Sequence, residues 1–257
     1  MADFYRKILR VLNEQKIPYA IAGAFALHQH TGIWRATKDL DVFLTAENML
    51  RAVTELQDRG FECDILDPVW LTKVKKGPIF MDLITGMSNA VFVVDDSWIA
   101  RAKPATVLAI RTKVLATEEL LVSKLFVSRR ERFDGADIAH IVYGSRTPLN
   151  WNRILKLVGD HWELLLWSLL LFRYIYPADS GKVPRQVWKH LLKLLQDDLY
   201  KDNSKVPFRG TLVDDNMFAV DTEQWGLPNL LSQYRWRRLK DIAATKRVHR
   251  TKSKGAA

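Results

Sequence analysis

The chain has 257 residues, 48% of them hydrophobic and nine of them tryptophan, which excludes an intrinsically disordered protein. A single cysteine, Cys63, excludes an internal disulfide and fits a reducing compartment, so we expect a cytoplasmic protein. The most apolar run, residues 164–172, is much shorter than the roughly 20 residues of a membrane-spanning helix, and the first residues lack the apolar core of a secretory signal. We therefore expect no membrane partner.

The positive charge is concentrated in the second half of the chain. Residues 1–145 carry a net charge of +1, whereas residues 146–257 carry +9 of the total of +10. Nine basic residues lie between positions 235 and 254, where Asp241 is the one acid. A phosphate-bearing partner such as RNA fits this distribution, and so does a solvated tail that aids solubility.

In chain order, the first predicted element is an amphipathic helix over residues 3–15, followed by a short strand at 18–22. The strand ends at Gly23, and a sequence typical of a helix begins at Ala24. A strand that passes into a helix at a glycine leaves free backbone N–H groups at the positive end of the helix dipole. This junction can therefore bind a phosphate through its backbone.

Residues 38–44 alternate polar and apolar side chains and predict a second strand. Asp39 and Asp41 then point to the same face, about 6–7 Å apart along the strand. Two carboxylates at this separation repel each other unless a cation lies between them. Magnesium is the natural candidate, because it takes oxygen ligands and keeps the phosphates of a nucleotide as further ligands.

A third carboxylate is predicted inside an apolar hairpin. After a helix over 47–59 and a strand over 61–65, two strands over 69–74 and 79–84 flank a turn with the sequence Lys-Lys-Gly-Pro. Asp82 lies in the middle of the second of these strands. Because an unpaired charge there is costly, Asp82 should face a polar site or a cation, or pair with one of the nearby lysines.

The remainder of the chain is predicted to be mainly helical. Short strands are expected around Pro104, and Thr117 is expected to cap a helix that contains Lys124. Four tryptophans at helical spacing inside leucine-rich runs are expected in a core: Trp151, Trp162, Trp167 and Trp188. Later helices are predicted over 151–158, 162–174, 184–199 and 230–244, with an irregular segment at 208–226.

The residues around the glycine junction resemble the signature of a known superfamily. The residues that carry the resemblance are, in order, Gly23-Ala24, Ala26, Gly32, Arg35, Thr37, Asp39 and Asp41. This pattern is similar to that of the nucleotidyltransferase superfamily, which includes DNA polymerase beta, and within it to small bacterial nucleotidyltransferase-like proteins. The resemblance covers about the first 145 residues. The family usually has Gly-Gly or Gly-Ser at the junction, so Ala24 lacks a hydroxyl that could touch phosphate.

The resemblance implies roles for individual residues. The three catalytic and metal-binding carboxylates, for Mg²⁺ or Mn²⁺, would be Asp39, Asp41 and Asp82. The residues implied to bind the phosphates of the nucleotide are Gly23, Ala24, Arg35, Thr37 and Lys124. For Lys124 the alternative is a surface lysine whose stem lies along apolar neighbours. Asp134 and Asp137 resemble an Asp-x-x-Asp of these proteins and are expected to be structural or supporting residues.

The resemblance also implies an α+β fold. An N-terminal nucleotidyltransferase domain, with a mixed β-sheet flanked by helices, would be followed by a smaller helical domain. We predict limits of 1–145 for the first domain, 150–234 for a helical domain that recognises an acceptor, and 235–257 for a basic C-terminal helix and tail.

The implied activity is transfer of a nucleoside monophosphate from a nucleoside triphosphate, such as ATP, to an acceptor hydroxyl. The basic second half favours RNA, above all tRNA, in the style of nucleotidyltransferase toxins of toxin–antitoxin systems, for which a partner protein is also expected. Protein hydroxyls and aminoglycosides are other acceptors in the superfamily. The alternative is a catalytically silent binding module, an antitoxin or RNA-binding adaptor. Ala24 favours that alternative mildly, while the presence of three uncompensated carboxylates argues against it.

Overall fold

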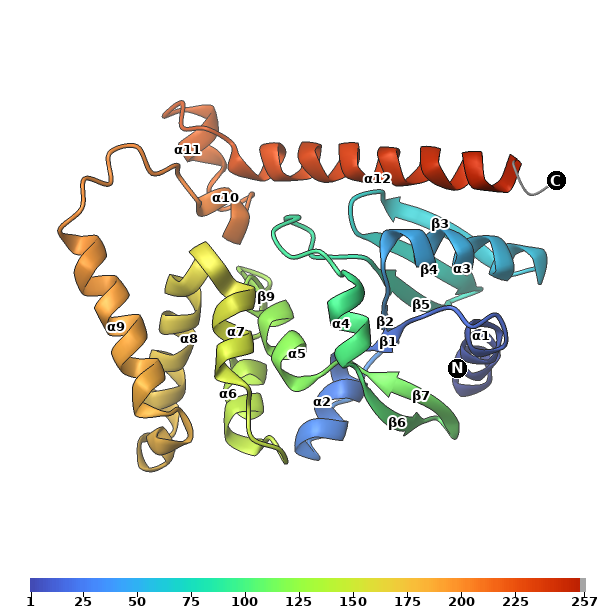
Figure 1. Ribbon diagram of the computed structural model, residues 1–257, viewed down its shortest axis with the longest axis horizontal. Helices are drawn as coiled ribbons and strands as arrows, with labels where there is room; N and C mark the ends of the chain where they lie inside the picture. Colours follow the sequence, from blue (N-terminus) through green and yellow to red (C-terminus); the bar gives the residue numbers. More distant parts are fainter. Residues whose placement is uncertain (255–257) are drawn as a thin grey trace. The chain divides into compact units, whose positions relative to one another are not determined.

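The structure, a computed structural model, describes the backbone of residues 1–254 and the side chains of residues 1–245. Contacts between residues divide the chain into two compact units. Unit 1 contains residues 1–29, 33–116 and the chain from residue 231 onward, and unit 2 contains residues 30–32 and 117–230. Figure 1 shows the elements in chain order, coloured from the N-terminus to the C-terminus.

Within the described residues, unit 1 is built on a seven-stranded mixed sheet with the strand order β3-β4-β5-β2-β1-β7-β6. The strands are β1 (Ala20–Ile21), β2 (Asp41–Phe43), β3 (Glu62–Asp67), β4 (Leu71–Lys76), β5 (Ile79–Ile84), β6 (Lys103–Val107) and β7 (Ile110–Val114). β2 pairs in parallel with β5, and β1 with β7, while the other neighbours are antiparallel. The helices that lie wholly or mainly in this unit are α1 (Ala2–Glu14), α2 (Gly23–Thr31), α3 (Ala46–Asp58), α4 (Asp96–Arg101) and α12 (Leu230–Lys254). This architecture confirms the predicted α+β fold.

The centre of the sheet is held by aliphatic side chains. In the antiparallel pair β1–β2, Ile21 lies opposite Val42, and both are fully buried. On the apolar side of α1, Ile8, Leu9 and Leu12 are fully buried as well, as their helical spacing predicts. Burial of each such side chain stabilises the fold by about 1.5–3 kcal/mol relative to an exposed one. The start of β2, where Asp41 lies, is therefore anchored to the core.

Unit 1 differs from the prediction at β2, β4 and α4. β4 lies two residues further along the chain than the predicted strand over 69–74. β2 begins at Asp41 and not at residue 38, because Asp39 lies in a loop where its backbone and side chain bond to the hydroxyl of Thr37. Helix α4 was not predicted; Asp95 caps it by accepting from the backbone N–H of Ser97. The strands around Pro104 are confirmed. Pro104 lies on β6, at the edge of the sheet, where a strand tolerates the missing N–H of proline.

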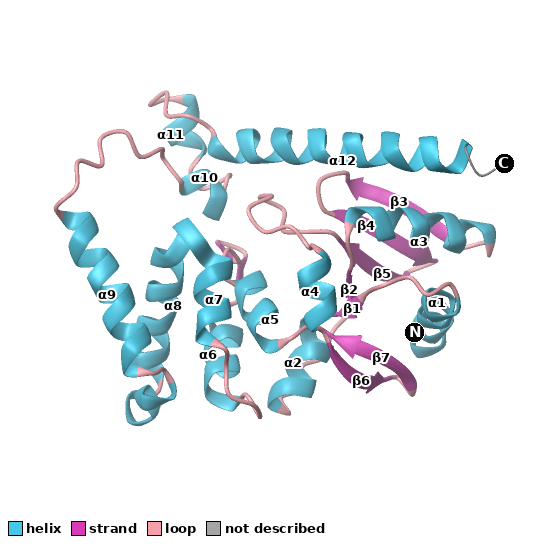
Figure 2. Cartoon of the chain, in the orientation of Figure 1, coloured by secondary structure: helices cyan, strands magenta, loops and turns pink. Residues whose placement is uncertain are grey.

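Unit 2 is helical apart from a small hairpin (Figure 2). Its hairpin strands are β8 (Ser128–Arg129) and β9 (Arg132–Phe133). Its α-helices are α5 (Thr117–Lys124), α6 (Gly135–Gly144), α7 (Trp151–Val158), α8 (Trp162–Ile175), α9 (Arg185–Leu199), α10 (Gly210–Val213) and α11 (Ala219–Glu223). The last two short helices occupy the segment that was predicted to be irregular. The long helices α7, α8 and α9 confirm the predicted helical second half.

Two side-chain predictions in unit 2 are wrong. Thr117 does not cap α5 but is its first residue, and its hydroxyl contacts Nδ1 of His30 at 3.1 Å. Trp151 is buried as predicted, whereas Trp167 is 45% exposed. The ring of Trp167 lies on the outer side of α8 and packs against Phe133 of β9. Helical spacing within a leucine run therefore did not distinguish the inner from the outer side of this apolar helix.

The two compact units divide the chain at other residues than the predicted domain limits of 1–145, 150–234 and 235–257. Helices α5 and α6 belong to unit 2 because α5 packs against α7, and α6 against α8.

In the described part of the chain, no helix is long and apolar enough to span a membrane.

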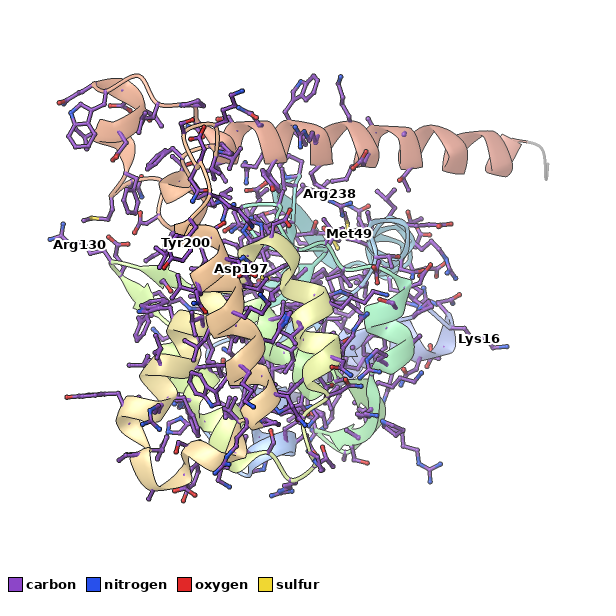
Figure 3. The ribbon with its side chains drawn as sticks, turned by 60° about the vertical axis from the view of Figure 1, so that its left-hand side comes forward. Lys16, Met49, Arg130, Asp197, Tyr200 and Arg238 are labelled. Atoms are coloured by element: carbon purple, nitrogen blue, oxygen red, sulfur yellow. The ribbon has the colours of Figure 1, made fainter. Side chains whose placement is uncertain are left out.

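The first half of α12 is attached to unit 1 by two arginines. Arg235 donates to both carboxylate oxygens of Asp67 at 3.0 Å and to the carbonyl of Ser88 at 2.7 Å. Arg238, labelled in Figure 3, donates to the carbonyl of Thr85. These contacts join residues more than 140 positions apart in the sequence. Part of the basic C-terminal segment is thus structural.

Candidate active site

Three carboxylates meet at the centre of the sheet of unit 1. Asp39 precedes β2, Asp41 begins β2, and Asp82 lies in β5. Each offers one carboxylate oxygen, and these oxygens lie within 4.8 Å of one another. The parallel register pairs Asp41 with Asp82, which places both side chains on the same face of the sheet. The structure thus brings together the three residues that the sequence singled out.

The donor chemistry of this acidic cluster fits a hard divalent cation. Carboxylate oxygens are the ligands that magnesium takes, at bond lengths of about 2.0–2.1 Å. Oxygens within 4.8 Å of one another can share one such cation after small side-chain rotations. Burial raises the pKa of the Asp82 carboxyl, Lys73 opposes this shift and Asp39 adds to it. A bound divalent cation would offset the repulsion that Asp39 and Asp41 exert on Asp82.

Asp82 also forms an ion pair, the alternative that the sequence left open. Lys73 on β4 is its cross-strand partner, and its Nζ donates to Oδ1 of Asp82 at 2.6 Å. Oδ2 is the second oxygen of this carboxylate and can serve as a metal ligand. Asp82 therefore combines both predicted environments, a cation pair on one side and the acidic cluster on the other.

Two hydroxyl groups support the loop that carries Asp39. The hydroxyl of Thr37 donates to Oδ1 of Asp39 at 2.7 Å. The hydroxyl of Tyr5, a buried residue of α1, donates to the carbonyl of Lys38 at 3.3 Å. Burial, followed by the negative charges of Asp39, Asp82 and Asp41, raises the pKa of Tyr5 to about 12. The phenol therefore stays protonated and acts as a donor at this loop.

Gly23 forms the wall of the site beside Asp41. Its φ is +55°, and a Cβ placed on it would lie 2.0 Å from Oδ2 of Asp41. The carboxylate thus occupies the space that any side chain at position 23 would need. Gly23 is also the first residue of α2, where the first backbone N–H groups, including that of Ala24, have no partner within the helix. These donors suit an anion next to the carboxylates.

The remaining two predicted nucleotide-binding residues lie in different surroundings. Arg35 is exposed in the loop between α2 and β2. Lys124 belongs to unit 2, where its Nζ lies 3.0 Å from Asp134 and 2.7 Å from Asp137. Its side chain is only 7% exposed, so it is not the surface lysine that was the alternative. The Asp-x-x-Asp pair is confirmed as a structural partner, here of Lys124.

Residues 1–159 match the protein family described as "Nucleotidyl transferase of unknown function (DUF2204)". The chain belongs to this family. Membership confirms the predicted superfamily and the predicted enzyme class, a nucleotidyltransferase. It also supports, in general terms, transfer of a nucleoside monophosphate and a nucleotide substrate. No curated protein is significantly similar to this nucleotidyltransferase.

Three solved structures share a distant likeness with this nucleotidyltransferase. An antigenic nucleotidyltransferase-like protein from Paracoccidioides brasiliensis has 16% identity and a TM-score of 0.46, covering 70% of this chain and 90% of that one. The antibiotic-resistance factor ANT(2'')-Ia has 14% identity and a TM-score of 0.42, covering 70% and 95%. The lincosamide antibiotic adenylyltransferase LnuA, bound to lincomycin, has 19% identity and a TM-score of 0.38, covering 55% and 94%. Likenesses this weak do not indicate the acceptor of this nucleotidyltransferase.

Sequence reasoning missed Tyr5 as a residue of the site and did not identify which of the nearby lysines pairs with Asp82. Tyr5 shares the apolar stripe of α1 with Ile8, Leu9 and Leu12, and a buried tyrosine hydroxyl usually has a partner, which was a usable signal. Lys73 could have been found by counting outward from the hairpin turn, because a tight turn centred on Gly77 and Pro78 makes residue 73 the partner of 82.

Proposed function

We propose that this nucleotidyltransferase transfers a nucleoside monophosphate from a nucleoside triphosphate to an acceptor hydroxyl, using Mg²⁺ or Mn²⁺ held by Asp39, Asp41 and Asp82. The observation that carries this proposal is the acidic cluster beside the N-terminus of α2, which combines a cation site with anion donors. When bound, the cation would neutralise the triphosphate and polarise the phosphate under attack.

The residues around the cluster have distinct roles in this proposal. The backbone N–H groups of Gly23 and Ala24 bind phosphate oxygens, and Thr37 orients Asp39. Asp82 shares the metal and helps to deprotonate the attacking hydroxyl, because it lies in the same cluster of carboxylate oxygens as Asp39 and Asp41. Arg35 and Lys124 remain predicted contacts of the phosphates.

The first prediction tests the metal site. We expect the protein to bind a nucleoside triphosphate in Mg²⁺ and to lose this binding in chelator, because bare carboxylates repel a polyphosphate. Asp39→Asn and Asp41→Asn should reduce the Mg²⁺-dependent affinity at least about tenfold without lowering the melting temperature, since each removes one repelling charge. Asp82→Asn should lose binding as well, but it also loses the ion pair with Lys73 and is expected to be less stable.

Calorimetry with and without chelator measures this affinity for each triphosphate in turn. Asp64→Asn is a matched control, because Asp64 lies on β3 in the same sheet and pairs with Lys75 outside the acidic cluster. Equal affinity with and without Mg²⁺ would contradict the metal role. A protein that binds the nucleotide but transfers nothing to total RNA, lysate protein or aminoglycosides would support the silent binding module instead.

For the acceptor, we propose RNA, above all tRNA, in the style of toxin–antitoxin nucleotidyltransferases acting in the cytoplasm with a partner protein. The support is the charge of residues 146–257 and the exposed side of α12. On that side Trp236 is 58% exposed, and the ammonium of Lys240 lies 3.5 Å from the centre of its ring. Arg237 is exposed as well. Exposed aromatic and basic side chains together suit stacked bases and phosphates.

The second prediction concerns this acceptor. Arg237→Glu with Lys240→Glu should weaken RNA binding and flatten its dependence on salt by about 0.7–0.9 per lost phosphate contact for each decade of salt. Triphosphate affinity should not change. Truncation before Arg235 is a poor test, because Arg235 and Arg238 hold α12 on unit 1. Lys246 and Arg247 belong to the nine basic residues between positions 235 and 254 that we expect to contact RNA, but their side chains lie outside the described residues. Unchanged RNA binding by the double variant would rule out this side of α12.

A further inference from the structure

A basic residue lies in the same row of side chains as two of the carboxylates. In the antiparallel ladder of β4 and β5, Lys73 lies opposite Asp82, and in the parallel ladder of β5 and β2, Asp82 lies opposite Asp41. Residues paired across neighbouring strands point to the same face. Lys73, Asp82 and Asp41 therefore form one row across three strands.

Lys73 is held firmly in this row. Its Nζ lies 2.6 Å from Oδ1 of Asp82, with side-chain exposures of 19% for Lys73 and 12% for Asp82. The same ammonium lies 3.6 Å from the centre of the Phe80 ring. Both partners restrain the ammonium, because ion pairs and cation–π contacts are stronger where little water competes for the charge. The ammonium is thus held in place within the site.

Lys73 sets the formal charge of the acidic cluster, which contains Asp39 in addition to the two carboxylates of the row. Three carboxylates and one ammonium give the cluster a formal charge of −2, which one divalent cation neutralises. Without Lys73 the formal charge would be −3. We propose that Lys73 is a positioning residue, a proposal that rests on the metal site of the proposed function. Lys73 holds Oδ1 of Asp82 and limits the nucleotide-free protein to one divalent cation.

A titration of the nucleotide-free protein with Mn²⁺ tests this proposal, with calorimetry for affinity and electron paramagnetic resonance for the amount of free Mn²⁺. We expect one Mn²⁺ per chain in the unmodified protein. Lys73→Gln keeps a hydrogen-bond donor but removes the charge, so Mn²⁺ should bind at least about tenfold more tightly or with a second equivalent. Lys73→Arg keeps the charge and should restore the original affinity and stoichiometry.

Lys75→Met is the matched control. Lys75 lies two residues further along β4, but its carboxylate partner is Asp64 on β3, outside the acidic cluster. Removing this charge should leave Mn²⁺ binding unchanged. If the net charge of the protein alone mattered, Lys73→Gln and Lys75→Met would change Mn²⁺ binding to the same extent.

Thermal unfolding separates this role from a merely structural one. In chelator, Lys73→Gln should be less stable than the unmodified protein, because it leaves a buried carboxylate without a cation. Added Mn²⁺ should raise its melting temperature more than that of the unmodified protein. If Lys73→Gln folds only with Mn²⁺, the proposal is supported; if it fails to fold in either condition, the proposal is overturned.

Two failures are distinguishable. Equal Mn²⁺ affinity and stoichiometry in the unmodified protein and in Lys73→Gln would overturn the role of Lys73 and leave the metal site intact. A folded, unmodified protein that takes up no Mn²⁺ would overturn the metal site of the proposed function, and the role of Lys73 with it.

Discussion

Replacing Gly23 with alanine is expected to weaken Mg²⁺-dependent nucleotide binding and to slow nucleotidyl transfer about 100-fold, because a misplacement of about 1 Å in a catalytic site costs about that much in rate. The new Cβ would lie 2.0 Å from Oδ2 of Asp41, far inside van der Waals contact. Asp41 is the first residue of β2 and lies opposite Asp82 of β5 in the parallel ladder. Its backbone carbonyl accepts a hydrogen bond from the N–H of Ala22, so the backbone is fixed on both sides. The carboxylate would have to leave its position in the cluster.

The substitution should also destabilise the fold, by the cost of a non-glycine residue at positive φ, which is about 1–2 kcal/mol. Gly77→Ala separates this backbone cost from the effect on the site. Gly77 has a φ of +58°, close to the +55° of Gly23, but no atom lies within 4 Å of a Cβ placed on it. We expect Gly77→Ala to lose similar stability in chemical denaturation and to bind Mg²⁺ and nucleotide normally. Normal binding by Gly23→Ala would show that Asp41 is not a ligand.

Local sequence patterns were sufficient for the residues whose environment is decided by their neighbours in the chain. Asp82 stands out because it interrupts an apolar strand, and Gly23 because it ends one strand and begins a helix. The hairpin that carries Asp82 was predicted from its turn; β5 is found where expected, and β4 is shifted by two residues toward the turn. Each carboxylate could be singled out in this way, but local patterns do not show which strands are neighbours, so the meeting of Asp39 and Asp41 with Asp82 was implied by the family resemblance.

Contacts between distant segments could not be read in the same way. Tyr5 reaches the loop at Lys38 from a separate helix, and Arg235 meets Asp67 across 168 positions. Neither contact leaves a periodic trace in the sequence, because each depends on how elements pack and not on which element forms. The same holds for the start of β2, where the Thr37–Asp39 hydrogen bond competes with the strand and local alternation could not show it.

Lys124→Met is expected to lower the free energy of unfolding by about 3–5 kcal/mol at pH 7, the usual effect of removing one partner from a buried ion pair. Lys124 is 7% exposed and lies within 3.0 Å of both Asp134 and Asp137. Its loss would leave two buried carboxylates with no ammonium between them. Lys193→Met is the surface control, because its pair with Asp197 is largely exposed and should contribute under about 0.5 kcal/mol.

The dependence of the free energy of unfolding on pH gives this prediction a second test. Burial disfavours the charge of Asp134, but Lys124 and Arg132 outweigh it and lower its pKa. A carboxyl with a lowered pKa in the folded state stabilises the protein above its unfolded pKa of 3.8, and this stabilisation is lost as the pH falls through the lower, folded pKa. In Lys124→Met the buried carboxylates lack this partner, so protonating them relieves the strain. The stability difference between the two proteins should therefore shrink as the pH is lowered from 7 toward 4 in denaturant titrations.

A rescue variant distinguishes a structural Lys124 from one that also binds phosphate. Lys124→Met combined with Asp134→Asn and Asp137→Asn removes all three charges of the cluster, and such neutral replacements recover most of the lost stability. If Lys124 serves the fold alone, this triple variant should bind Mg²⁺ and nucleotide with the original affinity. If it also contacts the phosphates, as predicted, the variant should be stable and yet bind the triphosphate at least about tenfold more weakly, the usual scale of a charge-assisted hydrogen bond.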